Sequence, residues 1–235
     1  MRKAKGLKVL KELMIARLHK RGGIYMEKKK MKLWKKILLV VLALLVVFAI
    51  LTLRKYIIIT KLINASKDYA NKTNFMVNTY SLTNDSVVLT KSYYKDKNLF
   101  SETQTFSHNI LEERKITAYN KDNEKIVIIQ AGENKVLLSN GDVAPVYVNT
   151  ISEFDDIKFK IPLAFTAKIK KEECNNKECY LIELSKDYKI WVEKESGIII
   201  REMDIGYITN RTYTFDIVKD EDIVKPDISD CKIQE

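Results

Sequence analysis

The sequence predicts an α+β protein in which one apolar helix is followed by a long antiparallel β-sheet. Residues 37–53 form an uninterrupted apolar run without a charged side chain. Residues 54–72 continue with apolar side chains at helical spacing and contain neither proline nor glycine. From Asn74 onward, short runs of β-branched and aromatic residues alternate with turn signals, which is typical of strands. No linker, repeat or low-complexity stretch divides this last part, so we expect one domain.

The positive charge of the chain is concentrated at one end. Residues 1–53 hold 14 Lys/Arg and 2 acidic residues, whereas residues 54–235 hold 27 Lys/Arg and 29 acidic residues, for a net charge of +10. A domain that binds nucleic acid needs a basic face of its own. The mixed charges of the later part argue against nucleic acid as a partner.

The apolar run is long enough to cross a membrane. Its 17 residues, 37–53, span about 25 Å as a helix at roughly 1.5 Å per residue, and flanking side chains extend that length. Six lysines between Lys28 and Lys36 precede it, so the positive-inside rule predicts a cytoplasmic N-terminus. Because no cleavage site follows, we expect an uncleaved signal anchor. The predicted parts are a basic cytoplasmic N-terminus (1–33), a transmembrane signal anchor (34–55) and an extracytoplasmic domain (56–235).

This division predicts a single-pass protein of the cell membrane.

The first 25 residues have two interpretations. Arg21-Gly22-Gly23 can be encoded by a ribosome-binding sequence at bacterial spacing before Met26, which would make Met26 the true start. Alternatively, residues 6–18 form a basic amphipathic helix in the cytoplasm.

Strands are expected at 74–82, 85–94, 98–106, 114–120, 124–132, 134–140, 165–173, 179–185, 189–194, 197–208 and 211–218. Residues 146–164 interrupt them with a helical or irregular segment, in which Pro162 limits any helix. The strands around Trp191 and Ile199 carry apolar side chains at consecutive positions, so both faces of this hairpin must be covered. A shift of one residue in register would exchange Trp191 and Val192 between the faces, and the sequence leaves that choice open.

The cysteines suit an oxidising compartment. Cys174 and Cys179 bracket a four-residue segment in a predicted hairpin, where either a disulfide or two free thiols can occur. A zinc site is disfavoured because His19 and His108 are the only histidines. Cys231 has no predicted role.

Few residues suggest catalysis. His108 lies at a predicted strand end and is expected to be a surface residue. Glu153, Asp155 and Asp156 are expected to form a solvated acidic segment, since no other ligand types cluster near them in sequence. We therefore predict no catalytic residue, no metal, no cofactor and no enzymatic activity.

Four stretches, in order, resemble the LolA-like half-barrel superfamily, which includes lipoprotein carriers and RseB-like regulators. They are SYYKDKNLFSE, KECYLIEL, the tryptophan hairpin IWVEKESGIIIRE and the closing strand YTFDIVKDEDIVKPDIS. Together with the opening helix, the resemblance covers roughly residues 56–229. It implies a strongly curved antiparallel half-barrel that wraps around helices and encloses a hydrophobic cavity.

The resemblance implies a membrane-anchored extracytoplasmic binding protein that holds an acyl chain, a lipid or a lipidated partner. Candidate cavity residues are Trp191, Ile199, Tyr213 and Phe215, whose strands carry apolar side chains. The alternative is an envelope sensor, regulator or structural protein of the RseB type, which acts through a protein partner.

Overall fold

The computed structural model of the chain describes residues 3–107, 110–138 and 141–234. It consists of two compact units, Met1–Leu53 and Arg54–Glu235. The first long helix, α1 (Lys3–Ala70), contributes to both units. In the part of α1 that belongs to the first unit, apolar side chains are exposed, for example Leu38 at 68% and Leu39 at 69%. Across the described ranges, α1 supplies the one helix that is long and apolar enough to cross a membrane.

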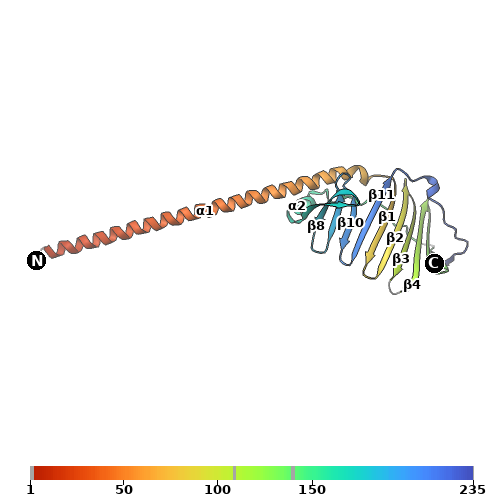
Figure 1. Cartoon of the computed structure of the whole chain (residues 1–235), viewed down its shortest axis with the longest axis horizontal. Coiled ribbons are helices and arrows are strands. Elements are labelled where there is room, and N and C mark those ends of the chain that lie inside the picture. The colour runs from red at the N-terminus through yellow and green to blue at the C-terminus, as the bar shows by residue number, and fades with distance from the viewer. Residues whose placement is uncertain (1–2, 108–109, 139–140, 235) are drawn as a thin grey trace. The chain divides into compact units, whose positions relative to one another are not determined.

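The second unit is built on one large, open and curved sheet (Figure 1). Its 12 strands follow the order β12-β6-β5-β4-β3-β2-β1-β11-β10-β9-β8-β7, and all neighbours are antiparallel except β12 and β6, which are parallel. The strands are β1 (Asn74–Thr83), β2 (Ser86–Lys95), β3 (Asn98–Ser107), β4 (Ile110–Lys121), β5 (Glu124–Ala131), β6 (Asn134–Leu138), β7 (Lys168–Cys174), β8 (Lys177–Glu183), β9 (Lys189–Glu193), β10 (Ile199–Asp204), β11 (Tyr207–Phe215) and β12 (Lys232–Gln234).

One face of the sheet is covered by helices at the β7–β10 end, and we call it the helix-covered face. The end of α1, the short helix η1 (Ile151–Phe154) and helix α2 (Ile157–Thr166) pack there. Ile59, Leu62 and Ile63 of α1 are almost fully buried against the sheet, as their helical spacing predicts. Their partners are Ile182, Ile190, Val192 and Ile199, together with Ile151, Leu163, Ala164 and Ala167.

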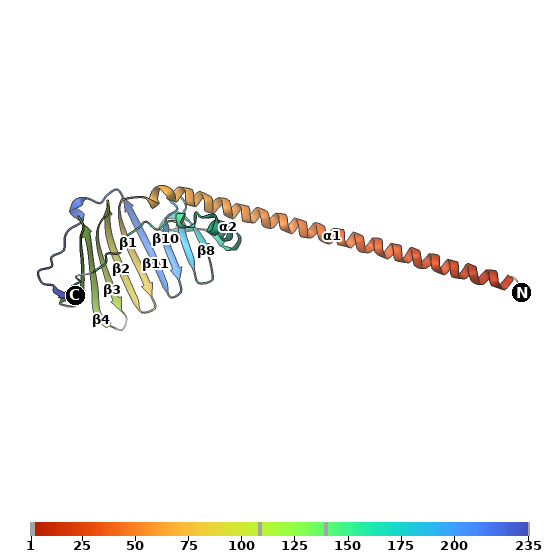
Figure 2. The same cartoon turned by 180° about the vertical axis from the view of Figure 1, so that it is seen from behind.

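The other face, which we call the outer face, is covered at the β4–β6 end by the C-terminal segment. Val218 and Ile223, the latter next to the short helix η2 (Asp220–Asp222), pack on Tyr119, Ile126 and Ile128. Figure 2 shows this segment beyond β4, at the edge of the sheet near the C-terminus. The two coverings therefore lie on opposite faces and toward opposite ends of the sheet.

The register settles which way the tryptophan hairpin faces. Val192 pairs with Ile199, and both belong to the core beneath α1, whereas Trp191 pairs with Arg201 on the outer face. An irregularity between Ile199 and Arg201 breaks the alternation at Ile200, so Ile198, Ile199 and Ile200 are all buried. Protein covers both faces of the hairpin.

Three expectations need correction. Residues 197–208 do not form one strand, because the chain reverses at Ile205-Gly206, where Gly206 has a φ of +80°. Pro162 lies inside α2 rather than ending it. The short strand β12, which pairs in parallel with β6, was not expected from a purely antiparallel meander.

Candidate interaction surface

Two of the four predicted cavity residues pack against the protein itself. Ile199 is 3% exposed and lies in the core under α1. Trp191 is 8% exposed on the outer face, where its Nε1 donates a hydrogen bond to Glu172 Oε2 at 2.7 Å. The guanidinium of Arg201 lies over the indole ring, 4.7 Å from its centroid. These contacts use both the ring face and the polar atom of Trp191.

The other two predicted residues, Tyr213 and Phe215, lie on β11 and share a pocket of about 610 Å³. Their rings are stacked with centroids 6.0 Å apart, and Phe215 also contacts Tyr69 of α1. Polar residues also line the pocket, among them Glu193, which accepts a hydrogen bond from Ser196 Oγ at 2.7 Å and pairs with Lys177 at 2.6 Å. The structure thus brings Tyr213 and Phe215 together, away from the Ile199 core, in a pocket of mixed polarity.

Cys174 and Cys179, the two cysteines of the predicted hairpin, lie on the same face of the sheet. Cys174 is opposite Lys177 and Cys179 is opposite Glu172, so the two cysteines are diagonal neighbours across β7 and β8. Both are free thiols in the structure, and burial, followed by the hydrogen bond to Cys174, raises the pKa of Cys179 to about 12. A disulfide between them stays a prediction.

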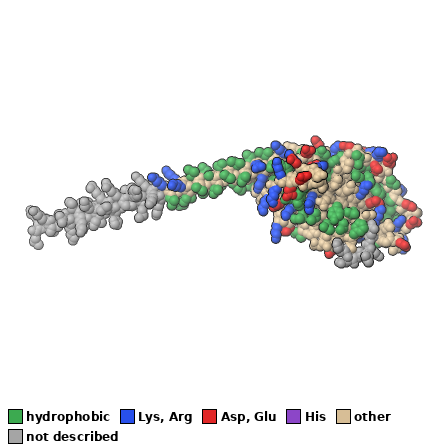
Figure 3. Space-filling model, in the orientation of Figure 1, with side chains coloured by type: hydrophobic (Ala, Val, Ile, Leu, Met, Phe, Trp, Pro, Cys, Tyr) green, Lys and Arg blue, Asp and Glu red, His purple; other side chains and the backbone are tan. Residues whose placement is uncertain are grey.

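The outer face carries an exposed feature that the sequence did not reveal, which we call the apolar row. Five hydrophobic side chains lie directly opposite one another on five neighbouring strands: Phe106, Val87, Leu82, Ile208 and Met203. Phe106 is 40% exposed and Leu82 is 37% exposed. Figure 3 shows hydrophobic side chains on the surface of this unit.

A second exposed pair lies beside the apolar row. Tyr80 is opposite Leu89, and these side chains are 42% and 38% exposed. Beyond this pair the face becomes polar, with an ion pair between Lys115 and Glu102 at 2.5 Å. On this side the exposed apolar surface is bordered by charged groups, as at many protein interfaces.

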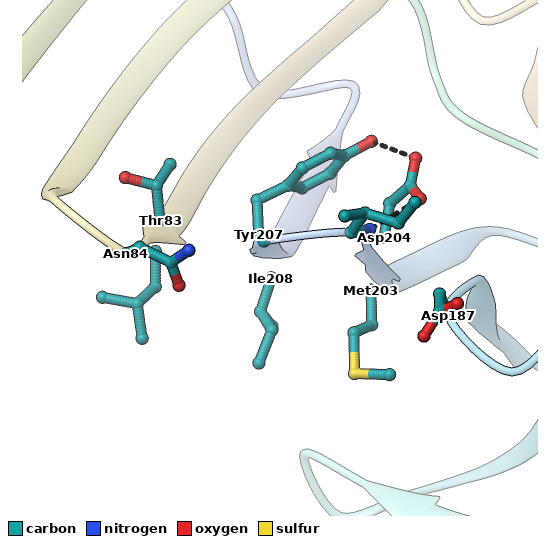
Figure 4. Close-up of a pocket in the computed structure, with 10 residues that line it drawn as sticks. Thr83, Asn84, Asp187, Met203, Asp204, Tyr207 and Ile208 are labelled. Atoms are coloured by element: carbon teal, nitrogen blue, oxygen red, sulfur yellow. Dashed lines mark hydrogen bonds between the residues drawn. The ribbon is translucent and has the colours of Figure 1, made fainter.

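A pocket of about 380 Å³ adjoins one end of the apolar row (Figure 4). Met203 and Ile208 line it and point to the same side of the strands, while Tyr207 and Asp204 lie on the other side. Tyr207 Oη donates a hydrogen bond to Asp204 Oδ2 at 3.2 Å, which fixes the turn between β10 and β11. Ile205 at the tip of this turn is 79% exposed.

A polar cluster on the helix-covered face was also not anticipated. Arg211 Nη2 donates a hydrogen bond to Glu202 Oε2 at 3.0 Å between β11 and β10. Nearby, the backbone N–H of Asn149 donates to Tyr213 Oη at 3.1 Å, and burial raises the pKa of this tyrosine. The first contact joins two neighbouring strands, and the second joins the segment before η1 to the sheet, so both have a structural role.

Within the described residues, no group of three or more His, Cys, Asp or Glu side chains is placed to hold a metal ion. Asp155 instead forms ion pairs with Lys67 and Lys160, and Asp156 caps α2 by accepting from Lys158 N at 2.9 Å. His108 lies outside the described residues.

No family model matches the sequence, and no curated protein matches it. Among solved structures, the chain is similar to a crystal structure of MucB, with a TM-score of 0.35 and 6% identity over 74% of this chain and 64% of that one. It is also similar to MucB in complex with MucA(peri), with a TM-score of 0.34 and 6% identity over 75% and 62% of the two chains. For the Pseudomonas aeruginosa MucA/MucB complex, the TM-score is 0.36 and the identity 8% over 75% and 63%.

The chain thus spans less than two thirds of the length of each of these proteins. Similarities of this size establish neither a family nor a function.

Proposed function

We propose that this chain is a membrane-anchored, non-enzymatic protein of the cell envelope whose extracytoplasmic domain acts by binding a protein partner at the apolar row. The observation that carries the proposal is the alignment of Phe106, Val87, Leu82, Ile208 and Met203 on five adjacent strands, with Phe106 and Leu82 exposed. An apolar patch that the described residues leave exposed is costly in water and marks an interaction site.

The dimensions of the row suit a protein segment. Five strands at roughly 4.8 Å spacing give a row about 19 Å long, the length of a helix of about 13 residues. Aromatic side chains at Tyr80 and Phe106 offer the kind of contact that dominates binding energy in protein interfaces. The Lys115–Glu102 ion pair at the border supplies a polar rim of both signs.

The membrane anchor is supported by the exposed apolar side chains of α1 in the first unit. A helix that is hydrophobic on every side is stable in a bilayer, whereas in water it would expose all of this surface. With lysines before the apolar run, the positive-inside rule favours a cytoplasmic N-terminus.

The alternative function, storage of an acyl chain, is favoured by one observation only. The pocket of about 610 Å³ that contains Tyr213 and Phe215 has an aromatic wall. However, Glu193 and Arg211 also line it, and an acyl chain would remove water from these groups without offering them a hydrogen bond. Native mass spectrometry of protein purified from its own membranes tests this alternative: bound lipid that survives purification would favour it.

Site-specific photocrosslinking in intact cells tests the partner-binding proposal. A photoreactive residue at Phe106 should yield one discrete protein adduct to the 27.3 kDa chain. The same group at Glu133, an exposed turn residue away from the row, is the matched control and should not give this adduct. Leu82→Glu, which places a charge in the row, should abolish the adduct while the protein still accumulates at its normal level. An adduct that persists in Leu82→Glu, or that forms equally at Glu133, would count against the proposal.

A further inference from the structure

Strand β11 loses its neighbour on one side before it ends. Its pairing with β10 ends at Asn210, whereas its pairing with β1 continues to Phe215. Near its first residue, Ile199, β10 bonds instead to the segment before η1: the Ile199 N–H donates to the carbonyl oxygen of Asn149 at 2.8 Å. Within the described residues, the end of β11 is therefore paired on one edge only, the edge next to β1.

The bonds to β1 show which backbone groups lie on the other edge of β11. The N–H of Asp216 donates to the carbonyl oxygen of Asn74 at 3.0 Å, so Asp216 faces β1. Because bonded residues alternate along an antiparallel ladder, Thr214 also faces β1, and Tyr213 and Phe215 direct their N–H and C=O groups the opposite way. None of the described residues bonds to these four groups. We call this side of Tyr213 and Phe215 the open edge of β11.

The pocket of about 610 Å³ lies along the open edge of β11. Thr212 and Phe215 both line it, although side chains of odd and even residues point to opposite faces of a strand. Space that touches both faces of β11 lies beside the strand, and β1 occupies the other side. Ser196 and Ile198, from the loop between β9 and β10, also line the pocket. At roughly 3.3 Å per residue, Arg211–Phe215 offers about 13 Å of strand to a ligand.

The side chains around the pocket indicate which ligand suits it. The stacked rings of Tyr213 and Phe215, with Tyr69 against Phe215, offer apolar contacts. Glu195 also lines the pocket; it is exposed and has no ion-pair partner among the described residues. A carboxylate in this position favours a ligand that carries a positive charge.

We propose that the open edge of β11 binds an extended peptide segment of alternating apolar and basic residues, which adds a strand beside β11. Main-chain hydrogen bonds to Tyr213 and Phe215 supply the affinity, and the alternate side chains supply the specificity. A helix cannot occupy this site in the same way, because its backbone groups are bonded internally. Sheets seldom leave such an edge uncovered, since it is a template for another strand. The inference is independent of the apolar row, which offers side chains rather than backbone groups.

Amide hydrogen exchange in the full-length protein in detergent tests whether the edge is open. The N–H groups of Tyr213 and Phe215 should exchange at least about tenfold faster than those of Thr212 and Thr214, which bond to β1. Equal protection of all four amides would overturn the proposal. Protection of Tyr213 and Phe215 that is lost on dilution would mean that a second copy of the chain fills the edge, which would overturn a peptide as the occupant.

Selection of a displayed library of random seven-residue peptides on the same protein supplies the probe. Enriched peptides should alternate apolar and basic residues, and the bound peptide should slow exchange at Tyr213 and Phe215 by at least about tenfold. Methylation of alternate backbone nitrogens of the peptide should abolish binding for one set of positions and not for the other, because β11 bonds to one edge of the peptide. A selection without enrichment, or peptides that bind without protecting these two amides, would overturn the proposal.

Two variants at one position isolate the backbone contribution. Phe215→Pro deletes an N–H of the open edge, and the ladder to β1 stays intact because this N–H is not part of it. Phe215→Ala removes the same ring but keeps the N–H, and is the matched control. The proline variant should bind the selected peptides about tenfold more weakly than the alanine variant, as expected for one lost hydrogen bond. Circular dichroism checks that both variants fold. Equal affinities of the two folded variants would contradict strand addition.

Discussion

Gly197 packs directly against the backbone carbonyl of Leu62, and this contact joins the tryptophan hairpin to α1. Gly197 has a φ of +65°, and a Cβ atom at this position would overlap the Leu62 oxygen and lie 2.7 Å from Ser66 Cβ. The carbonyl of Gly197 in turn accepts a hydrogen bond from the N–H of Ile151 at 3.0 Å. The hairpin, α1 and η1 therefore meet at one residue without a side chain.

Gly197→Ala should lower the free energy of unfolding by about 3 kcal/mol, because it combines an unfavourable φ with an overlap against backbone. Gly132→Ala is the matched control: Gly132 has a φ of +57° but nothing lies within 4 Å of the added Cβ. Gly132→Ala should lower the free energy of unfolding by only about 1 kcal/mol. Urea unfolding of the full-length protein in detergent, followed by circular dichroism, measures both. Equal losses in the two variants would contradict the packing argument.

Most strands were predictable because they have a local pattern and a turn signal at their ends. The face of α1 that contacts the sheet was also predictable, since Ile59, Leu62 and Ile63 recur at helical spacing and are buried. The turn at Ile205-Gly206 was missed because the apolar residues on both sides of it read as one continuous run. Strand β12 pairs over only three residues, too few for a recognisable pattern in the sequence.

The apolar row was not predictable from the sequence, because it depends on register rather than on the pattern of any one strand. Leu82 is placed between Val87 and Ile208 by two separate pairings, one local and one between distant segments. Half-exposed hydrophobic residues are common on single strands. Their alignment across five strands appears only after the sheet has formed. The position of Trp191 was open for the same reason, and the pairing with Arg201 resolves it.

Glu172 should stabilise the domain through its hydrogen bond with Trp191. Glu172→Ala leaves the partly buried indole N–H without its acceptor. It should therefore lower the free energy of unfolding by about 1 to 2 kcal/mol. Glu172→Gln keeps an acceptor oxygen at the same position and should cost less. Urea unfolding with tryptophan fluorescence compares the two variants. If glutamine is as destabilising as alanine, the hydrogen bond is not the source of the effect.

Asp155 should make the stability of the domain depend on pH in the acid range. Hydrogen bonds from Lys160 and then Lys67 lower the pKa of Asp155 below its ordinary value of 3.8. The stabilisation is therefore fully present above pH 3.8 and is lost as the pH falls through the lower folded-state pKa. Asp155→Asn should be less stable than the wild type at neutral pH, and the difference should disappear at strongly acidic pH. A difference that persists unchanged there would contradict this origin.

Cys174 and Cys179 should form a disulfide within their hairpin in protein taken from an oxidising envelope. They lie on the same face as diagonal neighbours, and a bond requires a small shift of the hairpin end, because diagonal Cα atoms are typically about 7 to 8 Å apart. Cys231 packs with the Tyr119 cluster, whose strands lie toward the opposite end of the 12-stranded sheet from β7 and β8. Linkage of Cys231 to either hairpin cysteine within one folded chain is therefore excluded by distance.

Non-reducing peptide mapping measures the linkage directly. The expected product is one fragment that contains both Cys174 and Cys179, with Cys231 recovered as a thiol. In reduced protein, Cys179 should react slowly with iodoacetamide at neutral pH, because burial keeps its pKa at about 12 and the thiolate is the reactive form. Replacement of both hairpin cysteines by serine should lower the melting temperature modestly, since the closed loop is short. Recovery of Cys174 and Cys179 as separate thiols from the native envelope would contradict the disulfide.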